Sequence, residues 1–354
     1  MPGTIEHFVT LNTHRKCPHA GRIWYLAGNS IANLSKPCLW RMTTMPNASS
    51  PADAISVVTV IGAGFLGRQI AAMCAASGRE VRLHDADPGA AEHAGAMLRD
   101  YLDTPIASGQ LSWDLDTVLT RITPVHDLAE AMRDTDLMIE AVREDLATKR
   151  EVFRAASTAN PRAYLATNSS SIMSAELRDC VIQTDRLANL HFFPEFWSRS
   201  MVELMGCGET SAESMETLRE FCESLGIYCA IVRGQSKGFI INRVWRAVKR
   251  EALRVVDEGH ADPEDVDRLW AFFWGIRYGP FAMMDRVGLD VIADIEDTYI
   301  AVATDPADVR SRTLHELVAR GELGVKTGSG FYSYPDPAYT VPGWPRATTD
   351  DEGS

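Results

Sequence analysis

The stretch VVTVIGAGFLGRQIAA at residues 57–72 decides how the rest of the chain is interpreted. Its first five residues are apolar and predict a buried strand, and the pattern after the glycines predicts a helix. Gly62 permits a tight turn, Gly64 lets backbone N–H groups approach a ligand, and Gly67 lets the helix pack closely on the strand. This succession indicates a dinucleotide site with the pyrophosphate at the helix N-terminus. A glycine-rich turn without a ligand is the alternative.

A second strand ends in an acid that supports the dinucleotide interpretation. Residues 81–85, VRLHD, place Asp85 23 residues after Gly62. An acid at this position accepts hydrogen bonds from the adenosine ribose hydroxyls, and its charge repels a 2′-phosphate. It is followed by Ala86 and Asp87 rather than by an arginine. The sequence therefore favours NAD over NADP as the cofactor.

Composition narrows the class of protein. The 354 residues are enough for roughly two or three domains. The apolar content of 45% is typical of a globular chain, and the net charge of −13 argues against nucleic acid as a partner. The sequence has no apolar run near the roughly 18 residues of a membrane span. Its seven cysteines are scattered without a CxxC pair, so we expect reduced thiols, a cytoplasmic location and no metal site.

The chain divides into four segments of different character. Residues 1–54 are basic, poor in acids and without a sustained apolar period, so we expect a disordered leader. We favour an extension without catalytic role; the alternatives are a transit peptide, which would place the protein in the mitochondrial matrix, and a start of translation at Met42 or Met45. Residues 55–236 alternate strand and helix with short links, which predicts an α/β fold with a doubly wound parallel sheet of the Rossmann type. Residues 237–335 predict an all-α domain, and residues 336–354 a loose tail.

Apolar spacing predicts the main helices. We expect one helix from Pro88 through Tyr101, one over residues 239–258 and a single helix over residues 281–300. Shorter helices are expected over residues 263–273 and 311–320. The dense apolar content of this helical segment is consistent with a homodimer interface and equally with an ordinary core.

Polar side chains follow several strands, at the edge where doubly wound sheets bind ligands. Residues 167–171 follow one strand, and their hydroxyls either cap a helix or contact a ligand. His191 ends another strand, and Glu203 is a lone carboxylate in an apolar run twelve residues later. A buried carboxylate is costly unless it is paired, so His191 is its natural partner. Such a pair would leave Nε2 as a general base, although a structural histidine is the commoner case. Asn242 lies in the first turn of the long helix, where it either holds an oxygen atom of a substrate or caps the helix.

A series of motifs follows along the chain: GAGFLG (62–67), IEAVRED (139–145), TNSSSI (167–172), HFF (191–193) with its Glu at plus twelve, GFIINR (238–243), GPFAMMDRVGLD (279–290) and LGVKTGSGFYSY (323–334). In this order they resemble the (S)-3-hydroxyacyl-CoA dehydrogenases, over residues 55 to 334. Each motif alone is weak, but together in register they are specific.

The resemblance implies a reaction and the residues that perform it. His191 would be the general base that takes the proton of a 3-hydroxyl, and Glu203 would orient it. Ser170 and Asn242 would hold the reacting oxygen. The implied NAD-binding set is Gly62, Gly64, Phe65, Leu66, Gly67, Asp85, Glu144, Lys149 and Asn168, with Glu144 and Lys149 flanking the nicotinamide. The family's helical domain dimerises, and its substrate lies between the domains.

The chain departs from the family in two places that concern the substrate. After His-Phe-Phe the family has Asn-Pro, whereas residues 194–197 here are PEFW, which predicts a reshaped pocket. The family's CoA users carry lysines near the CoA phosphates on the helix after the second strand. Residues 90–120 here hold five acids and one arginine, Arg99, which would repel a phosphate-rich carrier.

The expected substrate is therefore open between two classes. The first is a 3-hydroxyacyl thioester, on CoA or on an acyl carrier protein. The second is a free small hydroxy acid, as in relatives that act on L-gulonate or carnitine. A non-catalytic NAD-binding protein is a third interpretation, and the intact pair of His191 and Glu203 counts against it. We expect no membrane partner.

Overall fold

The structure is a computed structural model that describes residues 55–301, 303–341 and 343–344. The predicted leader, residues 1–54, and the end of the predicted tail lie outside the described residues.

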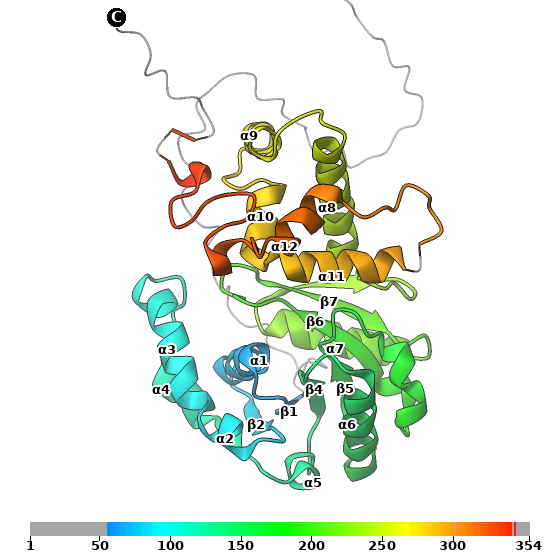
Figure 1. The fold of residues 1–354 in the computed structure, drawn as a ribbon. Helices are drawn as coiled ribbons and strands as arrows, with labels where there is room; N and C mark the ends of the chain where they lie inside the picture. Colours follow the sequence, from blue (N-terminus) through cyan, green and yellow to red (C-terminus); the bar gives the residue numbers. More distant parts are fainter. Residues whose placement is uncertain (1–54, 302, 342, 345–354) are drawn as a thin grey trace, which may run out of the picture. The chain divides into compact units, whose positions relative to one another are not determined.

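The first part of the described chain is built on one eight-stranded sheet (Figure 1). The strand order is β3-β2-β1-β4-β5-β6-β7-β8. The strands are β1 (Val57–Ile61), β2 (Glu80–His84), β3 (Ile122–Pro124), β4 (Leu137–Glu140), β5 (Tyr164–Thr167), β6 (Leu187–Phe192), β7 (Met201–Gly206) and β8 (Tyr228–Val232). Strands β1 to β6 are mutually parallel, whereas β7 and β8 run in the opposite direction. The predicted parallel, doubly wound sheet is confirmed, with a reversed pair of strands at one edge.

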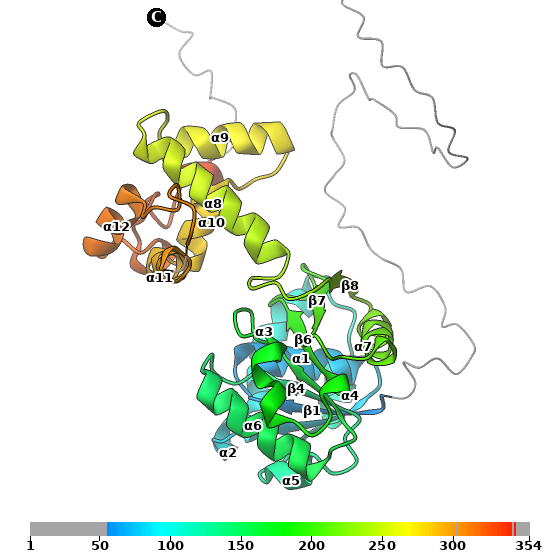
Figure 2. The same ribbon diagram turned by 90° about the vertical axis from the view of Figure 1, so that its right-hand side faces the viewer.

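Helices cover both faces of this sheet. They are α1 (Phe65–Ala76), α2 (Pro88–Glu92), α3 (Ala94–Ala107), α4 (Leu115–Thr120), α5 (Leu128–Ala131), α6 (Leu146–Ala159) and α7 (Ala212–Ser224), with short 3₁₀ helices η2 (Ser174–Cys180) and η3 (Thr184–Arg186). One core packs α1, α3, α4 and α7 on the sheet, and a separate core packs α6 and η2 on the other face. Figure 2 shows the strands between α6 and α7. Because both faces are covered, β4 and β6 are buried along their whole length.

The second part of the described chain is helical. Its helices are α8 (Ile241–Asp257), α9 (Pro263–Trp274), α10 (Pro280–Val287), α11 (Leu289–Ile300) and α12 (Arg312–Ala319), followed by η4 (Val325–Thr327) and η5 (Ala338–Thr340). These helices enclose a core of their own, centred on Phe281, Met284, Leu289, Ile292 and Leu314. None of the helices in the described part of the chain combines the length and apolar character that crossing a membrane requires.

Two predicted helices are wrong in their continuity. The helix expected from Pro88 breaks at His93 into α2 and α3, and Gly89 and Gly95 flank the break with poor helix propensity. The helix expected over residues 281–300 breaks at Gly288, whose φ of +104° a right-handed helix cannot contain. The beginning of the predicted loose tail is also ordered, because Tyr339 is buried against Tyr332.

Sheet topology places a ligand crevice beside β1. The chain leaves β1 for β2 on one side, and it later returns to β4 on the other side. Doubly wound sheets bind ligands at the carboxyl ends of strands at such a switch point. The glycine turn after β1, the loop after β4 and the polar loop after β5 all lie at this edge.

Candidate functional site

The glycine turn between β1 and α1 is sterically constrained at two of its three glycines. Gly62 has a φ of +109°, and a Cβ there would lie 2.5 Å from the carbonyl oxygen of Ala141. A Cβ on Gly67 would overlap the carbonyl oxygen of Gly62. A Cβ on Gly64, in contrast, would meet no described atom within 4 Å. The turn is therefore packed tightly on its protein side and open at Gly64.

The N-terminus of α1 is suited to hold an anion. Gly64 occupies the N-cap position without a side chain to cap the first amides, and the first turn contains no acid. The amides of Phe65 and Leu66 thus begin the helix at the exposed turn. Uncapped N–H groups and the helix dipole favour a phosphate at this position. These residues fit the pyrophosphate of a dinucleotide.

Asp85 lies beside the same turn. Its Oδ2 accepts a hydrogen bond from the amide of Ala63 at 2.7 Å, and its Oδ1 accepts one from the amide of Asp87 at 2.9 Å. A carboxylate has about four acceptor positions, so further positions remain for ribose hydroxyls. The acid therefore also fixes the glycine turn, a role that the sequence did not indicate.

A buried ion pair lies at the carboxyl ends of β4 and β5. The ammonium of Lys149, which is 1% exposed, lies 2.7 Å from Oε1 of Glu140, and Glu140 is fully buried. Oε2 of Glu140 accepts a hydrogen bond from the hydroxyl of Thr167 at 2.7 Å. Burial raises the pKa of Glu140, and Lys149, Thr167 and the amide of Val142 offset this only in part. Sequence reasoning did not single out Glu140, although a carboxylate in an apolar strand was the signal that found Glu203.

Glu144 connects this ion pair to the serine loop after β5. It receives hydrogen bonds from the hydroxyls of Ser169 and Ser171, and its Oε2 lies 3.2 Å from the ammonium of Lys149. Burial raises the pKa of Glu144, but the serine hydroxyls and Lys149 outweigh this and lower it below its usual value. Ser170 lies between the two anchored serines and is exposed. The loop that carries Ser170 is therefore held from both sides.

Asn168 braces the same loop against the next strand. Its side-chain Oδ1 accepts a hydrogen bond from the backbone amide of Phe192 at 2.9 Å, and its backbone amide donates to the carbonyl of Glu140 at 2.8 Å. These contacts link the ends of β4, β5 and β6. The predicted cofactor and catalytic residues on these three strands therefore lie at one edge of the sheet.

His191 and Glu203 form a buried pair across two strands. They are register partners in the antiparallel pairing of β6 and β7, and Nδ1 of His191 lies 2.9 Å from Oε2 of Glu203. Glu203 Oε1 accepts hydrogen bonds from the amides of Ile240 and Ile241, both at 2.9 Å. Burial raises the pKa of Glu203, but these three hydrogen bonds together lower it below its usual value. The ionised carboxylate can only accept, so Nδ1 carries the proton and Nε2 presents a lone pair.

Aromatic rings enclose this imidazole. Phe193 and Phe239 lie with their ring centroids 4.5 Å and 4.9 Å from that of His191. Phe239 has a φ of +54°, which is rare for a bulky residue and is sustained only by its surroundings. The turn at Phe239 leads directly into the amides that hold Glu203. Asn242 follows in the first turn of α8, one residue after Ile241, so the predicted oxygen-binding amide begins the helix that contacts the pair.

The segment PEFW at residues 194–197 packs against α3 and the chain before α4. Phe196 stacks on Trp113 with centroids 5.1 Å apart, and Trp197 contacts Tyr101 at 5.2 Å. The amide of Glu195 donates to the buried side chain of Gln69 at 2.9 Å. These aromatic side chains therefore contribute to a core between this segment, α1 and α3.

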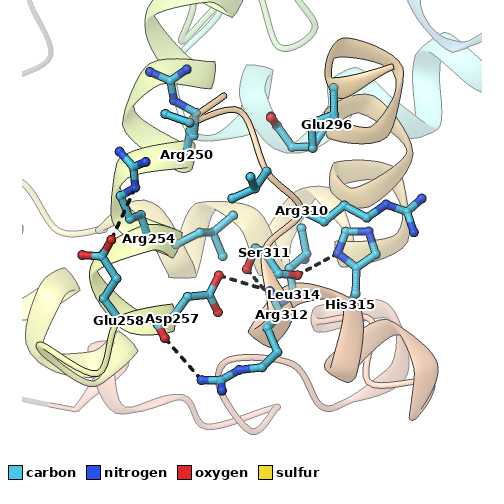
Figure 3. Close-up of a pocket in the computed structure, with 14 residues that line it drawn as sticks. Arg250, Arg254, Asp257, Glu258, Glu296, Arg310, Ser311, Arg312, Leu314 and His315 are labelled. Carbon is cyan, nitrogen blue, oxygen red and sulfur yellow. Dashed lines mark hydrogen bonds and ion pairs between the residues drawn. The ribbon is translucent and has the colours of Figure 1, made fainter. Parts of the chain in front are cut away.

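A cavity of about 240 Å³ lies elsewhere, between α8, α11 and α12 (Figure 3). Its four arginines are already engaged: Arg250 pairs with Asp308, Arg254 with Glu258 and Arg310 with Asp297, and Arg312 donates to the carbonyl of Asp257. Because these cations have partners in the protein, the cavity carries no charge pattern that points to a ligand.

Comparison with known proteins gives a consistent result. A family model described as 3-hydroxyacyl-CoA dehydrogenase, NAD binding domain, matches residues 57–234, and its C-terminal domain counterpart matches residues 238–334. The human mitochondrial hydroxyacyl-coenzyme A dehydrogenase is 33% identical over 86% of this chain and all of the relative. A 5-formyl-3-hydroxy-2-methylpyridine 4-carboxylate 5-dehydrogenase of Mesorhizobium japonicum is 29% identical over 78% of this chain and 90% of its own length. The structure of (S)-3-hydroxybutyryl-CoA dehydrogenase from Ralstonia eutropha superposes with a TM-score of 0.74 at 30% identity, over 80% of this chain and all of that one.

Proposed function

Because the chain belongs to the NAD-dependent 3-hydroxyacyl-CoA dehydrogenase family, we propose that it interconverts a 3-hydroxyacyl thioester and the 3-oxoacyl thioester, with His191 as the general base. The observation that supports this reaction is the buried contact of 2.9 Å between His191 and Glu203. A histidine held by an ionised carboxylate on Nδ1 can accept a proton on Nε2 and is stabilised when it does so.

The other residues take positioning roles in this proposal. When bound, NAD supplies the hydride chemistry. Nε2 of His191 removes the proton of the 3-hydroxyl, or returns it in the reverse direction, while Ser170 and Asn242 hold that oxygen. The amides at the start of α1 hold the pyrophosphate, and Asp85 holds the adenosine ribose. Near-attack geometry of the partners supplies much of the rate.

NADH oxidation with acetoacetyl-CoA and with free acetoacetate tests the proposal. We expect turnover of the thioester, loss of turnover in His191→Ala, and an NADH affinity that this variant retains. His126→Ala is the matched control, because this exposed histidine contacts Glu92 on the surface. Full activity of His191→Ala would refute its role as the base. NADH binding by the wild type without turnover of either substrate would favour a non-catalytic NAD-binding protein.

A free hydroxy acid is the second candidate substrate. The acids of residues 90–120, namely Glu92, Asp100, Asp103, Asp114 and Asp116, are all exposed, and the single arginine of this stretch pairs with Asp116. Their field opposes a polyphosphate carrier, and salt screens that field. Turnover of acetoacetate alone would support this candidate. Turnover of acetoacetyl-CoA with a KM that does not rise at low salt would exclude the effect of these acids.

We also propose a homodimer. Four large apolar residues at the end of α9 are strongly exposed: Leu269, Phe272, Phe273 and Trp274. A contiguous apolar patch of this kind marks an interaction surface. Sedimentation equilibrium should give a dimer for the wild type and a monomer for Phe273→Asp, and a wild-type monomer would contradict the proposal.

A further inference from the structure

The ion cluster formed by Glu140, Glu144 and Lys149 has an unbalanced charge. It contains two carboxylates and one ammonium, and Lys149 contacts both acids, at 2.7 Å and 3.2 Å. Arg143 lies in the same loop, but it is exposed and donates to Thr148 rather than to either carboxylate. The cluster therefore carries an excess negative charge at the carboxyl end of β4.

Hydrogen bonding favours the ionised form of both carboxylates; at Glu140 it offsets the effect of burial on the pKa only in part, whereas at Glu144 it outweighs that effect. Glu140 accepts hydrogen bonds from the ammonium of Lys149, the hydroxyl of Thr167 and the amide of Val142. Glu144 receives the hydroxyls of Ser169 and Ser171 in addition to Lys149. A carboxylate surrounded only by donors is stabilised in its charged form. The surplus charge is therefore part of the folded site.

The fold directs the nicotinamide half of the cofactor to this cluster. The amides of α1 hold the pyrophosphate, and Asp85, directly after β2, takes the adenosine ribose on one side of β1. The second nucleoside then extends to the other side of β1, where β4 and β5 are the next strands. The nicotinamide ring carries a positive charge when oxidised and none when reduced, so a surplus negative charge distinguishes the two states.

We propose that the cluster of Glu140, Glu144 and Lys149 selects the oxidation state of the cofactor, and that Glu144 provides the charge that favours NAD⁺ over NADH. The inference rests on the proposed function for the orientation of the dinucleotide. Coulomb attraction acts on the oxidised ring alone, whereas the contacts to pyrophosphate and adenosine are common to both states. The cluster thus sets the ratio of the two affinities and leaves the shared contacts unchanged.

Glu144→Gln tests the selection directly, because glutamine removes the charge and keeps an oxygen that can accept from the serines. Dissociation constants of NAD⁺ and NADH are measured by calorimetry at low ionic strength. We expect NAD⁺ binding to weaken about tenfold, which corresponds to about 1.4 kcal/mol, and NADH binding to weaken by no more than about twofold. Glu151→Gln is the matched control, since Glu151 is exposed on the same helix α6 as Lys149, and it should change neither constant.

A second variant separates charge from loop positioning. Replacing Ser169 and Ser171 together by alanine releases the loop from Glu144 but keeps the carboxylate and its contact with Lys149. We expect this double variant to leave the ratio of the two affinities unchanged. Equal weakening of both nucleotides in Glu144→Gln, or a changed ratio in the serine variant, would overturn the selection and leave Glu144 as a brace of the loop. Failure of the wild type to bind either nucleotide would instead overturn the cofactor assignment itself.

Discussion

Glu203→Gln is the substitution that examines the base most directly. Oε2 of Glu203 accepts from Nδ1 of His191, and Oε1 accepts from the amides of Ile240 and Ile241. Glutamine has one carbonyl oxygen, so it cannot serve both groups. The two amides retain that oxygen, because an NH₂ group facing them would leave donors opposed to donors. The NH₂ group then faces His191 and turns Nδ1 into an acceptor, which moves the ring proton to Nε2.

The expected loss follows from this change of tautomer. A ring protonated on Nε2 cannot take the proton of the substrate hydroxyl, and general base catalysis contributes about 10²–10⁴-fold to rate. We therefore expect kcat to fall by about 10²–10⁴, equivalent to about 2.7–5.4 kcal/mol of activation free energy. NADH affinity should change by less than about twofold. The reason is distance: the glycine turn proposed to bind NADH follows β1, whereas Glu203 lies on β7, and three strands separate β1 from β7 in the sheet.

Steady-state NADH oxidation with acetoacetyl-CoA, recorded across pH, measures kcat, and fluorescence titration measures NADH affinity. The control is Glu209→Gln, because Glu209 makes an exposed ion pair with Arg178 just beyond β7. Surface pairs contribute little, so this control should match the wild type. If Glu203→Gln retained kcat within about threefold with an unchanged pH profile, the argument that Glu203 orients the base would be refuted.

Three further predictions concern binding and stability. Asp85→Ala should weaken NADH binding and relax the discrimination against NADPH in competitive titrations; an unchanged preference would discredit the ribose contact. Gly67→Ala should lower Tm by more than about 5 °C, because its Cβ overlaps the carbonyl of Gly62, whereas Gly64→Ala should keep Tm and lose NADH affinity. Burial raises the pKa of Asp267 from 3.8 to about 6. The folded state therefore favours its neutral form, so wild-type stability relative to Asp267→Asn should fall by up to about 3 kcal/mol from pH 4 to pH 7. Equal pH slopes in denaturant titrations would contradict this.

Local patterns were sufficient to predict the glycine turn and the contact between His191 and Glu203. The glycine turn follows from a strand and a helix that adjoin it in sequence, so its geometry is encoded within sixteen residues. The pairing of His191 with Glu203 was predicted from the cost of burying a lone carboxylate. The structure supplies the reason for the spacing of twelve residues, since β6 and β7 are consecutive antiparallel strands that place the two residues directly opposite each other.

Contacts between distant segments could not be predicted in the same way. Periodicity shows which side chains face inward, but it does not show which polar groups meet there. The second oxygen of Glu203 is held by amides 37 and 38 residues later, and Glu140 receives a hydrogen bond from a hydroxyl 27 residues later. Helix α7, in contrast, was missed although the sequence contains the local pattern that predicts a helix. Its apolar spacing at Met215, Leu218 and Phe221 was a usable signal.

Two regions in which the sequence departs from the expected family pattern contact each other in the structure. In the sequence, PEFW at residues 194–197 and the acid-rich stretch at 90–120 are separate observations. In the structure, Phe196 stacks on Trp113 and Trp197 contacts Tyr101, so the segment beside the base and the acidic helices share an aromatic core. Residues 194–197 therefore pack against the same part of the chain that carries the exposed acids Asp100, Asp103 and Asp114. If the substrate is the free hydroxy acid of the second proposal, this shared aromatic core would account for both departures together.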